Sequence, residues 1–120
     1  IRNADLLGFT DEEKEILANT ARYHRKSHPK PGHEGFARLD REGQRLVRRL
    51  AAILRIADAL DRSHDGRVAI LSVRRRGRRW TLVASSRKPL DLERWAFAER
   101  KRLFEEVFGV EACLRPSNRV

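Results

Sequence analysis

The stretch from Leu50 to His64, LAAILRIADALDRSH, constrains the fold most strongly, because its apolar residues recur with the three- and four-residue spacing of a helix. We expect a helix over residues 41–62, with a buried stripe made of Leu46, Val47, Leu50, Ile53, Leu54, Ala57 and Leu60. Asp58 and Asp61 each follow a member of this stripe by one turn, so both carboxylates are expected on the apolar face. A carboxylate in such a place must be paired, protonated or bound to a metal.

Two interpretations of these acids stay open. The first is structural, with an N–H group or an arginine as partner in a contact between helices. The second is metal binding, which is favoured by two acids one turn apart and by His64, which follows Asp61 after three positions.

A preceding helix is predicted from Asp11 to about Arg25, because Thr10 and Glu13 form a capping box at its start. His24 falls on the apolar face of that helix. It is either a core histidine bonded to a carbonyl or to one of the acids, or a metal ligand or proton shuttle close to Asp58. Residues 26–39 contain prolines, glycines and two histidines without any period, and we predict a loop there.

After Asp65 and Gly66 the pattern changes from the helical period to alternation, which predicts two strands, about 68–73 and 80–84. A third helix is predicted over 91–108, with Asp91 as its N-cap, Gly109 as its stop and Trp95 on its apolar face, before a last strand about 110–114. The sequence therefore predicts an α+β fold, with helices in residues 1–65 and a small β-β-α-β unit with an antiparallel sheet in residues 66–120. We expect both parts to form one compact unit.

The chain of 120 residues has 27 lysines and arginines against 17 acids, a net charge of +10, which indicates a polyanionic partner or an acidic neighbouring domain. Two sets of arginines are the candidate contacts: Arg45, Arg48, Arg49 and Arg55 on the long helix, and Arg74, Arg75, Arg78 and Arg79 beside the turn between the strands. The second set has an alternative role, since charges on an edge hairpin also prevent aggregation. No apolar run is long enough for a bilayer, and the single Cys113 suits a reducing, cytoplasmic compartment.

Four segments together resemble the C-terminal region of the exopolyphosphatase/guanosine-pentaphosphate phosphatase (Ppx/GppA) family: IRNADLLGFTDEE, ARYHRKSHP, LRIADALDRSH and FEEVFG. The resemblance covers essentially the whole chain. It implies an HD-like helical region that follows an N-terminal phosphatase core of the actin-like ATPase superfamily. It also implies metal-binding roles: Asp58 resembles the last aspartate of HD metal sites, and His24 falls where some HD relatives keep an additional histidine.

The other HD ligands would lie upstream of Ile1, and the chain contains no methionine, so we expect a piece of a longer protein. Such a piece is predicted to be inactive alone, with no catalytic residue of its own, while Mg²⁺ or Mn²⁺ serves the full-length hydrolase. Its predicted role is accessory: binding polyphosphate or a guanosine polyphosphate, shaping a cleft beside the N-terminal phosphatase domain, or forming a homodimer. Two alternatives remain, a non-enzymatic nucleic-acid-binding or interaction module, and part of an HD-type metal phosphohydrolase acting on nucleotides.

Overall fold

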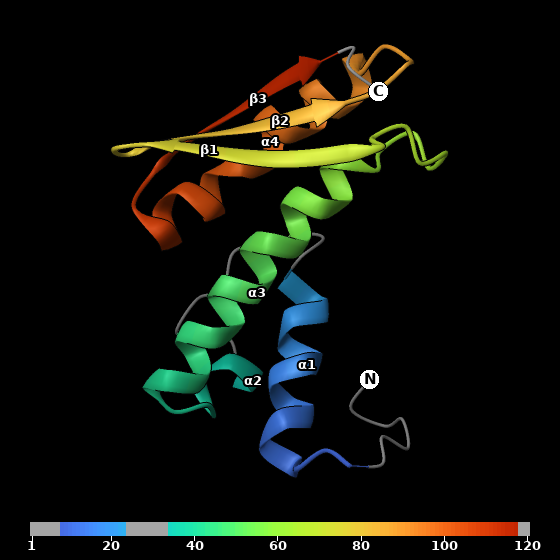
Figure 1. The fold of residues 1–120 in the computed structure, drawn as a ribbon. Helices are drawn as coiled ribbons and strands as arrows, with labels where there is room; N and C mark the ends of the chain where they lie inside the picture. Colours follow the sequence, from blue (N-terminus) through green and yellow to red (C-terminus); the bar gives the residue numbers. More distant parts are fainter. Residues whose placement is uncertain (1–7, 24–33, 118–120) are drawn as a thin grey trace. The chain divides into compact units, whose positions relative to one another are not determined.

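A computed structural model describes residues 8–23 and 34–117 and shows the predicted α+β fold (Figure 1). In chain order the elements are α1 (Asp11–Tyr23), α2 (Glu34–Ala37), α3 (Arg41–Leu60), β1 (Ile70–Arg76), β2 (Arg79–Ser85), α4 (Asp91–Phe108) and β3 (Glu111–Ser117). The contacts divide the chain into two compact units, Ile1–Leu54 and Arg55–Val120. None of the described helices is long and apolar enough to cross a bilayer.

The two long N-terminal helices begin where their capping residues predict. The Thr10 hydroxyl accepts from the Glu13 N–H at 3.1 Å, and the Glu13 carboxylate accepts from the Thr10 N–H at 2.8 Å, so the capping box is confirmed. The Asp40 carboxylate accepts from the Gly43 N–H at 2.7 Å at the start of α3. Each contact satisfies a backbone donor that the first helical turn leaves free.

The prediction of a loop over residues 26–39 was wrong in part, because α2 lies within it. The ring of Phe36 packs edge-on against Tyr23 at 6.0 Å between centroids, and the Asn19 side chain donates to the Gly35 carbonyl at 3.3 Å. A helix of four residues is too short for its sequence to show a helical period. Contacts with α1 stabilise α2 instead.

The predicted buried stripe of α3 was wrong in large part. Val47 and Leu60 are buried as predicted, but Leu46, Ile53 and Leu54 keep 42, 48 and 41% of their surface exposed. The buried side chains of α3 are those of Val47, Ala51, Ala52, Arg55, Ile56, Ala59 and Leu60. Apolar residues lie almost all round this helix, so the period identifies the helix without choosing its packed side.

The C-terminal turns of α3 are part of the core of the second unit. Ile56, Ala59 and Leu60 pack with four residues of the sheet and of α4, namely Leu82, Ala96, Phe97 and Ala112. For this reason the division between the two compact units falls within α3.

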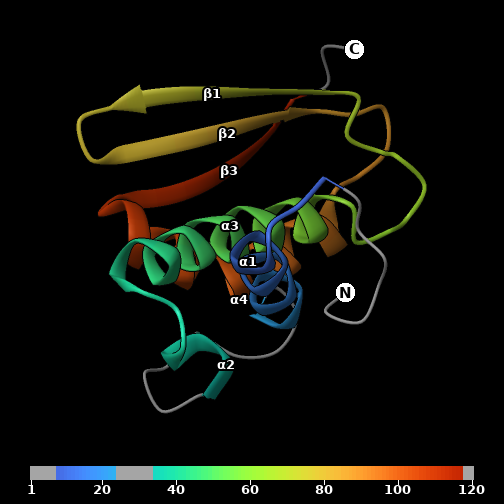
Figure 2. The ribbon, with the colours of Figure 1, turned by 90° about the horizontal axis from the view of Figure 1, so that it is seen from below.

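The sheet has the order β1-β2-β3, with β1 and β2 antiparallel and β2 and β3 parallel (Figure 2). The expectation of an antiparallel sheet was therefore wrong for β3. The helix α4 connects β2 to β3 as a crossover, which returns the chain to the same end of the sheet before the next strand begins.

One face of the sheet packs on α4. The ring of Trp80 lies 5.9 Å from that of Phe104 and 6.0 Å from that of Phe108. Since side chains alternate along a strand, the pairing register assigns every second residue to the opposite face. We call this the open face; its residues are Ser72, Arg74, Arg76, Arg79, Thr81, Val83, Ser85, Glu111, Cys113, Arg115 and Ser117.

Two details of α4 differ from the prediction. Leu90, and not Asp91, occupies the N-cap position, without a side-chain hydrogen bond. Trp95 is 60% exposed, whereas Phe97, which the predicted face omitted, is buried. The end of the helix is confirmed: Gly109 adopts a left-handed conformation with φ of 65°, and its N–H bonds the Glu105 carbonyl.

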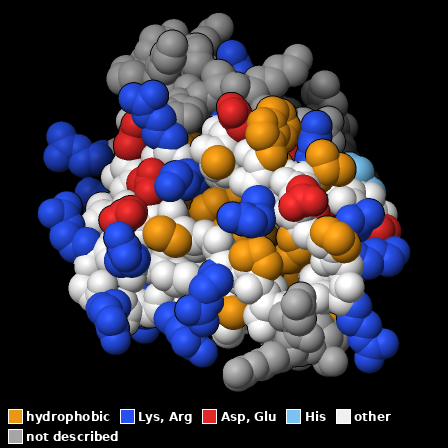
Figure 3. All heavy atoms as spheres, turned by 90° about the horizontal axis from the view of Figure 1, so that it is seen from above, with side chains coloured by type: hydrophobic (Ala, Val, Ile, Leu, Met, Phe, Trp, Pro, Cys, Tyr) orange, Lys and Arg blue, Asp and Glu red, His pale blue; other side chains and the backbone are white. Residues whose placement is uncertain are grey.

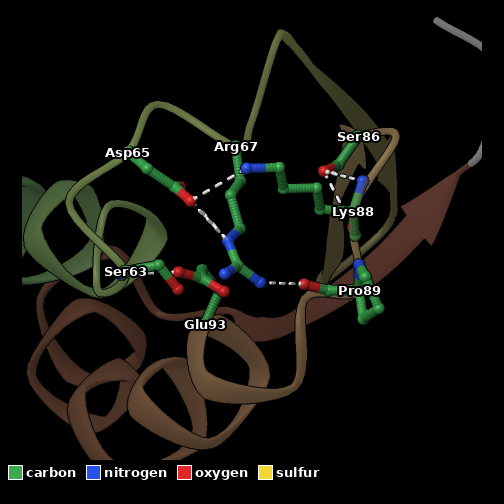
Figure 4. Close-up of polar contacts among 7 residues, drawn as sticks. All are labelled: Ser63, Asp65, Arg67, Ser86, Lys88, Pro89 and Glu93. Carbon is green, nitrogen blue, oxygen red and sulfur yellow. Dashed lines mark hydrogen bonds and ion pairs between the residues drawn. The ribbon is translucent and has the colours of Figure 1, made fainter.

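A polar network holds the segments around the start of α4 together (Figure 4). The Ser63 N–H donates to the buried Glu93 carboxylate at 2.7 Å. Arg67 donates to both Asp65 oxygens at 3.0 and 3.1 Å and to the Pro89 carbonyl at 2.9 Å. The network connects the end of α3 with the segments that lead into β1 and α4.

Candidate functional site

Asp58, the predicted metal ligand, lies at the contact between α3 and α4. Arg100 of α4 donates a hydrogen bond to the Asp58 carboxylate at 2.6 Å. The Arg100 side chain is 21% exposed and that of Asp58 is 36% exposed, so the pair is only partly in contact with solvent. The structural interpretation of Asp58, an arginine partner between helices, therefore has a geometric basis.

A second guanidinium, that of Arg55, lies near Arg100. The Arg55 side chain is buried, and burial first and the nearby charge of Arg100 second lower its pKa. A divalent cation at Asp58 would compete with the Arg100 guanidinium for this carboxylate, and the metal role of Asp58 stays a prediction. Arg55 was predicted as a contact for a polyanion; its side chain is only 8% exposed.

The other predicted members of the metal site do not gather around Asp58 within the described residues. Asp61 lies in the turn after α3, and its carboxylate is 3.9 Å from the imidazole of His64, both side chains being largely exposed. Residues 8–23 and 34–117 contain no group of three His, Cys, Asp or Glu side chains that could hold a metal. His24 lies outside the described residues, so its contact with Asp58 stays a prediction.

The hairpin between β1 and β2 carries the densest positive charge, as the sequence predicts. All its arginines are exposed: Arg74, Arg75, Arg76, Arg78 and Arg79. Arg75 stacks over the Trp80 ring at 5.6 Å, and Arg79 lies 3.5 Å from the Glu111 carboxylate. In the described part of the chain the other three guanidinium groups have no carboxylate partner.

Three of the four helix arginines lie on α3 in the first unit. Arg45 and Arg49 are exposed and Arg48 is half-buried. The fourth, Arg55, belongs to the second unit, as do the hairpin arginines.

The open face supplies an arginine that the prediction missed. Arg115 of β3 lies on the same face as Arg74, with β2 between their strands. Figure 3 shows how many basic side chains, in blue, surround the molecule in the view from the sheet side, with few acidic ones in red between them. The alternation of Ala112 and Leu114 with Cys113 and Arg115 was the available signal, but it needed the strand order to show what Arg115 faces.

A sequence model of a protein family, described as Ppx/GppA phosphatase, domain III, matches residues 1–106 of the chain. The chain belongs to the Ppx/GppA phosphatase family. The resemblance drawn from the four sequence segments is thereby confirmed, and the chain is a C-terminal domain of an exopolyphosphatase-like protein. No curated protein matches the chain.

The matched part of this Ppx/GppA domain ends at residue 106, within the last turn of α4. It includes Asp58, Arg100 and the whole β1–β2 hairpin. The strand β3 (Glu111–Ser117), which completes the open face and carries Arg115, follows the matched residues.

Proposed function

We propose that this Ppx/GppA domain is an accessory part of an exopolyphosphatase-like hydrolase and binds linear polyphosphate or a guanosine polyphosphate through its arginines. The observation that carries the proposal is the β1–β2 hairpin, where Arg74, Arg76 and Arg78 are exposed without a carboxylate partner among the described residues. Guanidinium groups bind phosphate oxygens in a bidentate manner, and phosphate chains carry charge at every unit, so a series of unpaired arginines suits them.

The remaining parts of the proposal concern the longer protein. An N-terminal phosphatase domain, served by Mg²⁺ or Mn²⁺, would supply the chemistry, and the domain described here would hold the polyanion beside it in the cytoplasm. The helical part of the domain would be related to HD domains. The same domain would also form a homodimer. The Asp58–Arg100 pair supports an accessory role, because it gives the aspartate that resembles an HD metal ligand an arginine partner in a contact between helices.

The alternative, a nucleic-acid-binding module, has less support. Single-stranded nucleic acids are usually held by exposed aromatic rings on which bases stack. Trp80 packs against Phe104 and Phe108 on the covered face of the sheet, and the exposed Trp95 belongs to α4. The open face itself has arginines and hydroxyl groups and no aromatic residue.

Binding of long-chain polyphosphate to the 120-residue chain tests the proposal. We expect affinity to fall steeply as salt rises, because the contacts are between exposed charges. The variant R74Q/R75Q/R78Q/R79Q should bind at least about tenfold more weakly, given about 1.5 kcal/mol or more for each hydrogen bond to a charged group.

A matched control removes four other exposed arginines, R41Q/R62Q/R87Q/R94Q, and has the same net charge. The control should keep most of the affinity, and circular dichroism should show that both variants are folded. Equal losses of affinity in both variants would mean that the hairpin contributes only through the net charge of the chain. Binding that does not respond to salt would contradict the electrostatic proposal as a whole.

A further inference from the structure

The open face of the sheet is hollowed into a polar groove of about 440 Å³ over β2. The residues that matter for its chemistry are Ser72, Arg74, Val83, Ser85, Arg115 and Ser117. They come from all three strands, so the groove exists only after β3 has paired with β2. No carboxylate lines it.

The strand register explains how these residues meet. Val83 pairs with Ser72 of β1 on one side and with Arg115 of β3 on the other, so the three form one row across the sheet. Arg74 belongs to the next row toward the hairpin tip, and Ser85 and Ser117 belong to the row on the opposite side. Neighbouring strands are about 4.8 Å apart, so β1 and β3 are roughly 10 Å apart, and guanidinium groups from both can reach one ligand between them.

The charges in the groove are not neutralised within the described part of the chain. Arg74 and Arg115 have neither an ion pair nor a side-chain hydrogen bond there, and both side chains are exposed. The acid on this face, Glu111, pairs with Arg79 in a row nearer the hairpin tip. The floor is shielded, since Val83 is 7% and Ser85 8% exposed, and charges over such a floor are less weakened by solvent than at the hairpin tip.

We infer that this groove binds a phosphate group, with Arg74 and Arg115 on its two sides and the hydroxyl groups of Ser72 and Ser85 as further donors. Two arginines, several hydroxyl groups and no acid favour an oxyanion and disfavour a cation. The inference rests on the proposed function for the identity of the larger molecule, of which the bound group would be one unit. Arg76 on the same face extends the positive charge from the groove toward the hairpin tip.

The test uses amide NMR spectra of the 120-residue chain, titrated with inorganic tripolyphosphate at fixed salt. We expect the largest shifts for the amides of Ser72, Val83 and Arg115. The variant R74Q/R115Q should bind about 100-fold more weakly, at about tenfold for each arginine. Ser72→Ala leaves the charge unchanged and should weaken binding about threefold to tenfold through the loss of one hydroxyl donor.

The matched control is R87Q/R94Q, which also removes two exposed charges but changes no residue that lines the groove. It should weaken binding less than about threefold. Shifts confined to the hairpin tip, or equal losses in R74Q/R115Q and R87Q/R94Q, would overturn the inference. An RNA oligonucleotide that displaces tripolyphosphate from the groove at lower concentration than long-chain polyphosphate does would instead contradict the proposed function and favour a nucleic-acid partner.

This experiment separates the groove from the proposed function. Suppose that long-chain polyphosphate does not bind, but tripolyphosphate shifts the groove amides and R74Q/R115Q abolishes the shifts. The inference that the groove binds phosphate is then supported and the proposed function is contradicted. If long-chain polyphosphate binds and the groove amides do not respond, the proposed function is supported and the inference about the groove is contradicted.

Discussion

The guanidinium of Arg100 donates a 2.6 Å hydrogen bond to the Asp58 carboxylate and so ties the end of α3 to α4. The aspartate that the family resemblance marks as a metal ligand is thus used here in a contact between helices. The buried Arg55 lies close enough to Arg100 for the charge of Arg100 to lower the pKa of Arg55.

We predict that Asp58→Asn lowers the free energy of unfolding by about 1 kcal/mol, because the pair is partly shielded and its loss leaves two guanidinium groups together. A double-mutant cycle with Arg100→Gln should give a coupling energy of about 1 kcal/mol in urea unfolding experiments. The exposed pair Arg102–Glu106, at 3.3 Å, is the control and should give less than about 0.5 kcal/mol. A rise in Tm with Mn²⁺ that Asp58→Asn abolishes would instead support the metal interpretation.

A second prediction concerns Glu93 and pH. Burial raises the pKa of Glu93, but hydrogen bonds from Ser63 and from its own N–H, with the charge of Arg67, outweigh this effect, so the pKa is lowered overall. The stability from this carboxylate is therefore present above the unfolded-state pKa of about 4.3 and is lost as pH falls through the lower folded-state value.

Glu93→Gln should accordingly destabilise the domain at pH 7 by about 1–2 kcal/mol and flatten the dependence of stability on pH below pH 5. Urea unfolding at several pH values measures both effects. The exposed Glu99 on the same helix is the control, and Glu99→Gln should leave the pH profile unchanged. A Glu93→Gln profile as steep as that of the wild type would refute the role given to this carboxylate.

The two tryptophans should differ in their contribution to stability. Trp80 packs against Phe104 and Phe108, so Trp80→Ala should cost about 2–3 kcal/mol, somewhat less than a fully buried tryptophan. Trp95 is 60% exposed, and Trp95→Ala should change stability by less than about 0.5 kcal/mol. Thermal unfolding of both variants is the measurement. Similar losses of stability would mean that Trp95 is packed as the sequence pattern predicted.

The last prediction is that the 120-residue chain alone does not release phosphate from polyphosphate or guanosine polyphosphates. Activation of water by a metal normally needs three protein ligands, and the sequence offers Asp58 and His24 as its two candidates. Phosphate release in the presence of Mg²⁺ and Mn²⁺ is the measurement, with Asp58→Ala as the background. Turnover of the wild type above that background would contradict the prediction.

Local signals in the sequence predicted much of the fold. The capping box of Thr10 and Glu13, the Asp40 cap and the Gly109 stop are contacts between residues a few positions apart, and the structure shows each of them. Short segments of sequence likewise indicated the family. These features depend on residues that are close together in the chain, so the sequence pattern is enough to predict them.

Tertiary structure decided the features that depend on distant residues. The packed side of α3 includes Ala51 and Ala59, which are fully buried, whereas Leu54, which belongs to the apolar period, is 41% exposed. The direction of β3 followed from the α4 crossover, and only that parallel pairing places Arg115 beside Val83 on the open face. Alternation indicates that a strand has two faces, but the partner strand and the covering helix determine which face is buried and which side chains meet.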